Sequence, residues 1–231
     1  MNELEMRLSV FLEGGLRDYQ VDRAAFTNFT RRYRDPRSFM HAGKFLEYFL
    51  SEQFHQFEPD QAYIDIACQD CPFAKYVRKQ YLARAYRQDL YHLPSGIHEW
   101  DIGGQASELP FADGQVAGLS LHNSIEHFEG DSDTAFIREA QRVLRATGQL
   151  VVAPLYIALE PAEQHDAGWT DECGVKHLWG VGAQFARMYS PKTLAERVFD
   201  AAPGLCPAVY RVFGVEAAGR STFYLLVMTK R

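Results

Sequence analysis

A short apolar run ends in a polar turn within the stretch YIDIACQDCPF, residues 63–73. The run predicts a buried strand, and Pro72 is typical of the first turn of a helix. Turns between a strand and a helix hold nucleotide-like ligands in many α/β proteins. Glycines usually line such turns, whereas Ala67, Gln69 and Cys71 stand in their places here. The stretch is therefore a candidate ligand loop that lacks glycine.

The same turn also supports a second interpretation. Cys68 and Cys71 have the CxxC spacing of thiol–disulfide enzymes, at a helix N-terminus that can lower the pKa of a thiol. Locally this resembles a thioredoxin-type active site. The other cysteines, Cys173 and Cys206, make no dense disulfide framework with this pair, so we expect reduced thiols.

Titratable side chains lie at the ends of three predicted strands, at Asp65, Asp89 and His122. In a parallel sheet, ligands bind at the carboxyl ends of the strands. A carboxylate there can accept hydrogen bonds from two ribose hydroxyls, which makes Asp89 a candidate for ribose binding. A buried Asp65 needs polar partners, because an unpaired charge is costly to bury.

A second group of polar side chains lies in the irregular segment at about 157–189. Its spacing matches no known metal motif, so we expect a solvated lid loop and no metal. This segment and the N-terminal helices are the candidates for substrate recognition, with Trp169, Trp179 and Phe185 as the residues that could line an apolar wall. The polar residues are His165, Asp166, Asp171, Glu172, Cys173 and His177.

Composition limits the function classes. The chain has 231 residues, of which 47% are hydrophobic and 23% charged, and its net charge is −6. This suits one larger globular domain, or a domain with a small appendage. An acidic protein has no electrostatic reason to bind nucleic acid or an anionic membrane. The chain shows neither a secretory signal nor a long apolar run, so we expect a soluble, cytoplasmic protein.

The predicted elements fall into two regions. Residues 1–57 read as a helical N-terminal cap, with Phe39, Leu46, Phe49 and Leu50 on one apolar face. Residues 58–231 alternate strands with helices, which indicates a mostly parallel, seven-stranded sheet with helices on both faces and a C-terminal antiparallel hairpin. The predicted strands are residues 61–67, 83–90, 97–102, 115–122, 149–156, 208–215 and 222–230. The predicted helices are residues 72–82, 131–148 and 190–202, with Gly148 as a helix-terminating glycine.

Several motifs in this order carry a resemblance. They are Leu109-Pro110-Phe111, Asp113-Gly114, Glu126-His127, and the run REAQRVL at residues 138–144. With the strands around them, they resemble the class I, Rossmann-like methyltransferases that depend on S-adenosylmethionine, and within them the branch called type 11. The resemblance covers residues 60–230 and is most specific between 108 and 156.

The resemblance implies roles for individual residues. Asp65 would hold the amino end of the cofactor, Asp89 the ribose, and Gln105 with the backbone of Ala106 the adenine edge. His122 lies next to the reacting centre, and His127 follows it; either is a weak candidate for a catalytic base, and the catalytic residues are otherwise unassigned. The remaining predicted cofactor contacts are Ala67, Gln69 and Leu90.

Two departures from the family pattern are plain. The glycines of the first loop are absent, and the connection between Asp89 and Asp101 is too short for the usual crossover helix. The missing glycines keep an alternative open, a catalytically degenerate binding or partner module. The methyl acceptor, expected to be a small molecule, is not identified by the sequence, and a homodimer is possible.

Overall fold

A computed structural model describes the chain except for residues 34–41, 93, 165–167, 171–175, 179–184 and 215–222. It contains a nine-stranded sheet in the order β1-β12-β13-β7-β6-β2-β3-β5-β4. Six of the seven predicted strands correspond to single strands of this sheet, the predicted strand 97–102 is divided between two strands, and one edge strand was not predicted. The strands are β1 (Arg17–Gln20), β2 (Ala62–Ile66), β3 (Arg84–Asp89), β4 (Gly96–His98), β5 (Asp101–Gly103), β6 (Val116–His122), β7 (Leu144–Ala153), β12 (Leu205–Phe213) and β13 (Phe223–Lys230).

The pairing is mixed, as predicted. Strands β5, β3, β2, β6 and β7 run parallel to one another. Strand β13 pairs antiparallel with both β7 and β12, so the predicted terminal hairpin is confirmed. At the edges, β1 runs parallel to β12 and β4 runs antiparallel to β5.

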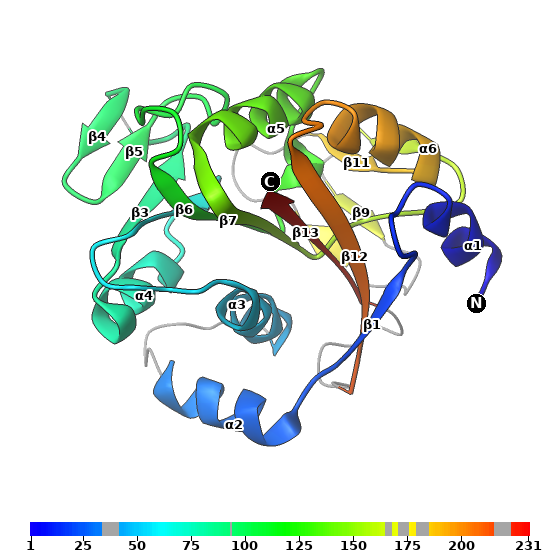
Figure 1. The fold of residues 1–231 in the computed structure, drawn as a ribbon, viewed down its shortest axis with the longest axis horizontal. Helices are drawn as coiled ribbons and strands as arrows, with labels where there is room; N and C mark the ends of the chain where they lie inside the picture. The colour runs from blue at the N-terminus through cyan, green and yellow to red at the C-terminus, as the bar shows by residue number, and fades with distance from the viewer. Residues whose placement is uncertain (34–41, 93, 165–167, 171–175, 179–184, 215–222) are drawn as a thin grey trace.

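Helices cover both faces of the sheet (Figure 1). On one face α2 (Arg23–Arg32), α3 (Ala42–Phe54) and α4 (Phe73–Tyr81) bury an aromatic-rich core that includes Phe29, Phe49 and Phe73. On the other face α1 (Glu3–Ser9), α5 (Ser132–Val143), α6 (Pro191–Leu194) and the π-helix η2 (Ala195–Phe199) pack on an aliphatic core. A single-turn 3₁₀ helix, η1 (Ile125–His127), follows β6.

Three stretches differ from the sequence prediction. The N-terminal region contains strand β1 besides its helices. The segment predicted as one strand over 97–102 folds as the β4–β5 hairpin, because Glu99 turns the chain with a positive φ of 58°. The segment at 157–189 includes short strands: β8 (Ala162–Gln164) with β11 (Ala186–Met188), and β9 (Gly168–Thr170) with β10 (Lys176–Leu178).

The end of α5 also differs. The helix stops at Val143, and β7 begins at Leu144, which pairs with Val116 before a shift in register. Gly148 therefore does not terminate a helix. A side chain there would place its Cβ atom 2.9 Å from the carbonyl oxygen of Arg145 and 3.1 Å from that of Ala117. Close backbone approach in the β6–β7 pair explains this glycine.

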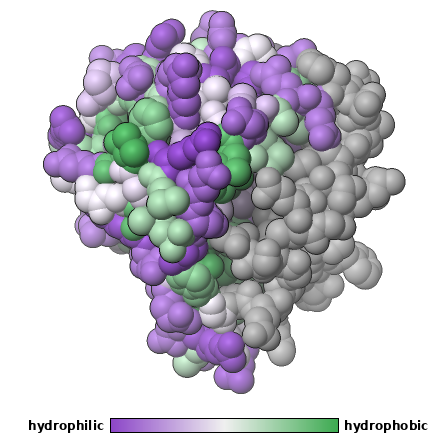
Figure 2. Space-filling model, turned by 90° about the vertical axis from the view of Figure 1, so that its right-hand side faces the viewer, coloured by the Kyte–Doolittle hydropathy of each residue, from purple (hydrophilic) through white to green (hydrophobic). Residues whose placement is uncertain are grey.

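Among the described residues, no helix is long and apolar enough to cross a membrane. On the face that Figure 2 shows, hydrophobic residues are scattered among hydrophilic ones. The connection between Asp89 and Asp101 contains β4 and, in its described residues, no helix, as its length predicted.

Candidate cofactor site

The predicted strand-end residues gather at one edge of the sheet. Asp65 is the penultimate residue of β2, whereas Asp89 and His122 close β3 and β6. Because β3, β2 and β6 are neighbours and parallel, their carboxyl ends meet at the same edge. All three side chains are buried. The topology therefore brings the three predicted residues to one edge of the sheet, and that they form one ligand site stays a prediction.

Asp65 is held by a buried hydrogen-bond chain. Its Oδ1 lies 2.8 Å from Nδ1 of His122, and Nε2 of His122 lies 2.7 Å from Oγ of Ser51 on α3. Asp65 and Ser51 are fully buried, at 0% exposure. Oδ2 of Asp65 is also buried and has no hydrogen-bond partner among the described residues.

The chain continues away from Asp65. Ser120 Oγ donates to Ser51 Oγ at 3.2 Å, and His55 Nε2 lies 2.8 Å from Ser120 Oγ. Each hydroxyl group has one hydrogen to donate. Because Ser51 accepts from Ser120, Ser51 can donate its own hydrogen to Nε2 of His122, and the Nδ1–H of His122 then donates to Asp65. We call these five residues the Asp65 relay. Burial lowers the pKa of His55 from 6.5 to about 3, so this end of the relay is neutral.

The order Asp–His–Ser also occurs in serine hydrolases. Here Ser51 belongs to α3 and is fully buried, and its hydroxyl group is already engaged by Ser120 and His122. Both ring nitrogens of His122 are engaged within the relay, which leaves neither to take a proton from an acceptor. The relay is thus suited to holding a carboxylate rather than to nucleophilic attack.

The first half of α3 adds a second set of polar contacts. Nζ of Lys44 donates to the carbonyl oxygen of His122 at 2.6 Å and lies 2.8 Å from Oε2 of Glu47. Glu126 of η1 is 1% exposed, and its Oε2 has no hydrogen-bond partner among the described residues. Burial raises the pKa of Glu126, partly offset by nearby His127. His127 itself lies with Nδ1 2.8 Å from the carbonyl oxygen of Phe185.

The candidate ligand loop keeps a glycine-like backbone without glycine. Ala67 has a φ of 48° and Gln69 a φ of 49°, in the left-handed region that favours glycine. The amide of Gln69 donates to Oδ2 of Asp89 at 2.7 Å, and the amide of Tyr91 donates to Oδ1 at 3.1 Å. Asp89 therefore fixes the loop, while each of its oxygens retains a second lone pair.

Gln88 joins the loop to the next strand end. Its Oε1 accepts from the amide of Ala67 at 3.1 Å, and its Nε2 donates to the carbonyl oxygen of Gly104 at 2.6 Å. Sequence reasoning missed this residue, although a buried amide directly before Asp89 was a usable signal. Leu90 is exposed, as is Gln105, whereas Ala106 is buried.

The family-like motifs downstream hold the 105–114 loop in place. The guanidinium group of Arg142 donates to the carbonyl oxygens of Phe111 and Leu109 at 2.8 and 3.2 Å. It also pairs with Asp113 at 2.9 Å. Glu139 accepts from the amide of Leu109 at 2.7 Å. These motif residues thus position the loop that carries Gln105 and Ala106, rather than performing chemistry themselves.

The two cysteines point to different surroundings. Sγ of Cys71 lies 2.8 Å from the hydroxyl oxygen of Tyr48, whereas Sγ of Cys68 contacts the carbonyl oxygen of Gln69. Burial raises the pKa of both thiols well above the usual value. A redox cysteine needs a lowered pKa, so the geometry does not favour the thioredoxin-like interpretation. Asp65, Cys71 and His122 each bring one potential metal-ligand atom within 4.8 Å of the others.

The polar group of the 157–189 segment falls largely outside the described part of the chain. His165, Asp166, Asp171, Glu172 and Cys173 lie outside the described residues, as does Trp179. The backbones of Trp169 and His177 belong to β9 and β10. Phe185 is buried and directly precedes β11.

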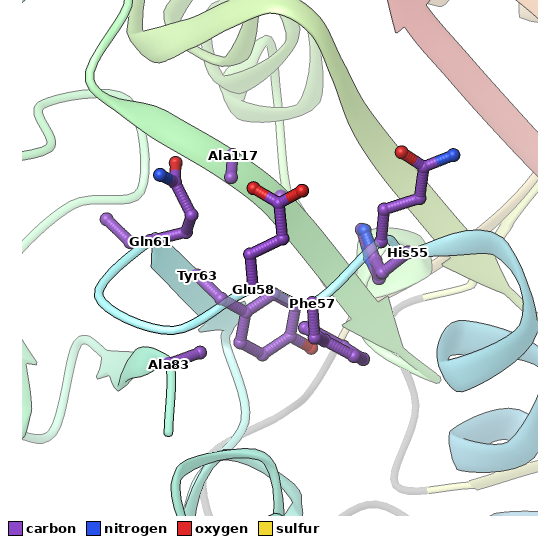
Figure 3. A pocket seen from close by; sticks show the side chains of 10 residues that line it. His55, Phe57, Glu58, Gln61, Tyr63, Ala83 and Ala117 are labelled. Carbon is purple, nitrogen blue, oxygen red and sulfur yellow. The ribbon is translucent and has the colours of Figure 1, made fainter. Parts of the chain in front are cut away.

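Two cavities lined by described residues lie at the opposite edge of the sheet. The first, of about 10 Å³, has His55, Phe57, Tyr63 and Ala117 around it (Figure 3) and has room for about one water. The second is an open groove of about 390 Å³ lined in part by Gln149, at the amino end of the β7–β6 pairing, and by residues of β12 and β13. Neither contains Asp65 or Asp89.

Comparison with known proteins agrees with this geometry. Residues 64–152 match the sequence model of a family described as a methyltransferase domain, type 11. No curated protein matches the chain.

Solved structures share the fold at low identity. A Burkholderia thailandensis 1,6-didemethyltoxoflavin-N1-methyltransferase, bound to its substrate and S-adenosylhomocysteine, is 17% identical with a TM-score of 0.55, over 94% of this chain and 93% of that one. A putative methyltransferase from Haloferax volcanii, in complex with the Trm112 activator, is 12% identical with a TM-score of 0.55, over 100% and 98%. A Mesorhizobium loti S-adenosylmethionine-dependent methyltransferase is 11% identical with a TM-score of 0.54, over 82% and 98%. Residues 64–152 therefore resemble a methyltransferase domain of the class I, type 11-like kind, and they belong to a sheet with the Rossmann-like fold of these structures.

Proposed function

We propose that the protein transfers a methyl group from S-adenosylmethionine to a small-molecule acceptor. One observation carries the proposal beyond the family match. Asp65 is fully buried, its Oδ1 is fixed by His122, and its Oδ2 has no partner among the described residues. A buried carboxylate oxygen without a partner is costly unless a cation or a strong donor occupies the space beside it. The α-ammonium group of S-adenosylmethionine fits that need.

The other predicted contacts follow the same edge of the sheet. Asp89 has lone pairs left for ribose hydroxyls beside the loop that it fixes. The loop backbone at Ala67 and Gln69 turns as a glycine loop does, which allows close approach of the ligand. Gln105 and the amide of Ala106 remain the proposed adenine contacts, on a loop anchored by Arg142.

The sulfonium of the bound cofactor supplies an activated methyl group for in-line displacement. The protein's part is to position the acceptor and to exclude water. If the acceptor loses a proton, Glu126 is a further candidate to receive it, beside the predicted His127. Its carboxyl group is buried, its Oε2 has no partner among the described residues, and burial raises its pKa, which favours accepting a proton.

For the methyl acceptor we propose a chemical class only, a small molecule. The Burkholderia enzyme named above has 1,6-didemethyltoxoflavin bound, which supports a small-molecule acceptor here. The non-catalytic alternative was based on the missing glycines. Because Ala67 and Gln69 keep positive φ values, that argument loses its force. A cytoplasmic location and a homodimer remain predictions, and light scattering of the purified protein checks the second.

Calorimetric titration with S-adenosylhomocysteine tests the proposal. We expect micromolar binding by the intact chain and a loss of about tenfold or more in Asp89→Ala. Asp70→Asn is the matched control, because Asp70 lies in the same loop with its side chain 99% exposed. We expect it to change the affinity by less than about twofold. No binding by the intact chain up to millimolar ligand would contradict the proposal.

A further inference from the structure

We propose that helix α3 is part of the cofactor site and that Ser51, Lys44 and His122 are positioning residues. Through them α3 sets the carboxylate of Asp65 so that Oδ2 faces the α-ammonium group of the cofactor. This inference rests on the proposed function. Helix α3 lies before residue 64, so the family match does not include it.

The spacing along α3 brings three side chains to His122. Lys44, Tyr48 and Ser51 are separated by four and three residues, which places them on one face of the helix. Lys44 donates to the carbonyl oxygen of His122, and Ser51 contacts its Nε2. The ring of Tyr48 meets the imidazole edge-on at 4.9 Å between centroids. One helix face therefore controls both the backbone and the ring of His122.

The imidazole is also confined from α4. The ring of Phe73 lies 5.1 Å from it at 82°, so aromatic rings from two helices restrict its rotation. With the ring fixed, Nδ1–H holds Oδ1 of Asp65 at 2.8 Å. A carboxylate fixed through one oxygen has its other oxygen fixed as well, because the group is planar. Oδ2 is thus set in direction by contacts that begin on α3.

The unpartnered end of the relay argues against a merely structural role. Buried polar networks are stabilising when every member is satisfied and costly when one is not. Along the relay each polar side-chain atom has a partner until Oδ2 of Asp65, which has none among the described residues. If the Asp65 relay served packing alone, a buried oxygen without a partner would bring no gain in stability. If the relay presents Oδ2 to a cationic ligand, this oxygen has a function.

The readout is the ratio of two affinities. S-adenosylhomocysteine has the amino-acid end that Asp65 would bind, whereas 5′-methylthioadenosine lacks it and keeps the adenosine. If Asp65 is no longer held in position, the affinity for S-adenosylhomocysteine falls, whereas the affinity for 5′-methylthioadenosine does not. A general structural defect weakens both.

The experiment uses calorimetric titration of the full chain with both ligands. We expect Ser51→Ala to weaken S-adenosylhomocysteine about tenfold and 5′-methylthioadenosine less than about twofold. His122→Asn keeps an N–H near the position of Nδ1. We expect the ratio of the two affinities in this variant to stay close to that of the intact chain. His122→Leu, of similar size, offers no donor and should lower the ratio about tenfold. The His122 pair keeps the test decisive if Ser51→Ala does not fold.

Ser190→Ala is the control for stability. Ser190 is also a buried serine, but it caps α6 by accepting from the amide of Thr193 at 3.2 Å. We expect this variant to melt about 2–4 °C lower with an unchanged ratio. An unchanged ratio in Ser51→Ala and in His122→Leu, with the intact chain binding both ligands, would overturn this inference alone. Failure of the intact chain to bind either ligand would overturn the proposed function, and this inference with it.

Discussion

Two carboxylates at neighbouring strand ends are held in opposite ways. Asp65, at the end of β2, is fixed by side chains that come from α3 and β6, and its Oδ2 has no partner among the residues that the structure describes. Asp89, at the end of β3, accepts backbone N–H groups from its own and the adjacent loop through both oxygens. The first is positioned from a distance by packed elements, and the second by local chain geometry. The same residue type can thus serve charge recognition at one strand end and loop shape at the next.

The largest expected effect is that of Asp65→Asn on ligand affinity, because only one of the two ligands has the ammonium group that Asp65 would bind. Asp65→Asn keeps an oxygen for His122 but removes the charge that would face the ammonium group. We expect binding of S-adenosylhomocysteine to fall about 30- to 100-fold, with 5′-methylthioadenosine little changed. The melting temperature should not fall, because the change removes a buried charge whose Oδ2 lacks a partner in the described part of the chain. Calorimetry and thermal melts check both parts; equal weakening of the two ligands would break the comparison.

The far end of the relay predicts a pH dependence of stability. The pKa of His55 falls from 6.5 in the unfolded chain to about 3 in the folded protein, because burial disfavours its charged form. Below pH 6.5 the unfolded chain therefore binds a proton that the folded chain does not. Stability drops as pH falls from 6.5 toward 3, by about 1.4 kcal/mol per pH unit from this residue.

Urea unfolding of the intact chain and of His55→Gln at pH 7 and pH 5 isolates this contribution. Gln can donate to Ser120 but does not titrate, so the stability of the His55→Gln variant should fall less between pH 7 and pH 5 than that of the intact chain. We expect the difference to be about 2 kcal/mol. Parallel pH dependences of the two proteins would show that His55 does not carry the effect.

Asp89 should behave as a loop anchor. Asp89→Asn leaves one of its two N–H donors, at Gln69 or Tyr91, without a good acceptor. We expect about 1–2 kcal/mol lower stability, and about tenfold weaker binding of both ligands because both contain ribose. Urea unfolding and calorimetry measure the two effects. Selective loss of S-adenosylhomocysteine alone would assign to Asp89 the role proposed for Asp65.

The smallest expected effect is the change in stability when Ala67, in the candidate ligand loop, is replaced by glycine. Ala67 holds a φ of 48°, which costs about 1–2 kcal/mol for a residue with a side chain. Ala67→Gly relieves that strain, and after the entropy cost of glycine we expect a net gain of about 0.5 kcal/mol. Ala112→Gly is the control, an exposed alanine without a positive φ, and should lose about 0.5–1 kcal/mol. Equal losses in the two variants would show that the loop at Ala67 is not strained.

The sequence prediction succeeded where local pattern and topology agree. Alternating apolar segments predicted the central strands, and Pro191 after Ser190 marked a helix start that the structure confirms with a capping contact. It failed where pairing overrides local signals. Gly148 looked like a helix terminator, but the helix ends at Val143 because Leu144 already pairs with Val116. Glu99 divides the strand predicted over 97–102 into two, although no glycine or proline lies within it to mark a turn.

By itself the sequence determined the order of strands and helices, the acids at the strand ends, and the motifs that resemble a methyltransferase. Tertiary structure alone decided how Asp65 is held. Ser51 and His122 are 71 residues apart, and Asp65 and His122 are 57 apart. No local period relates such positions, since only the packing of α3 on the sheet brings them together. The missing glycines are the second case: whether Ala67 and Gln69 can turn as glycine does depends on bonds from Gln88 and Asp89, and these form only when β3 lies beside β2.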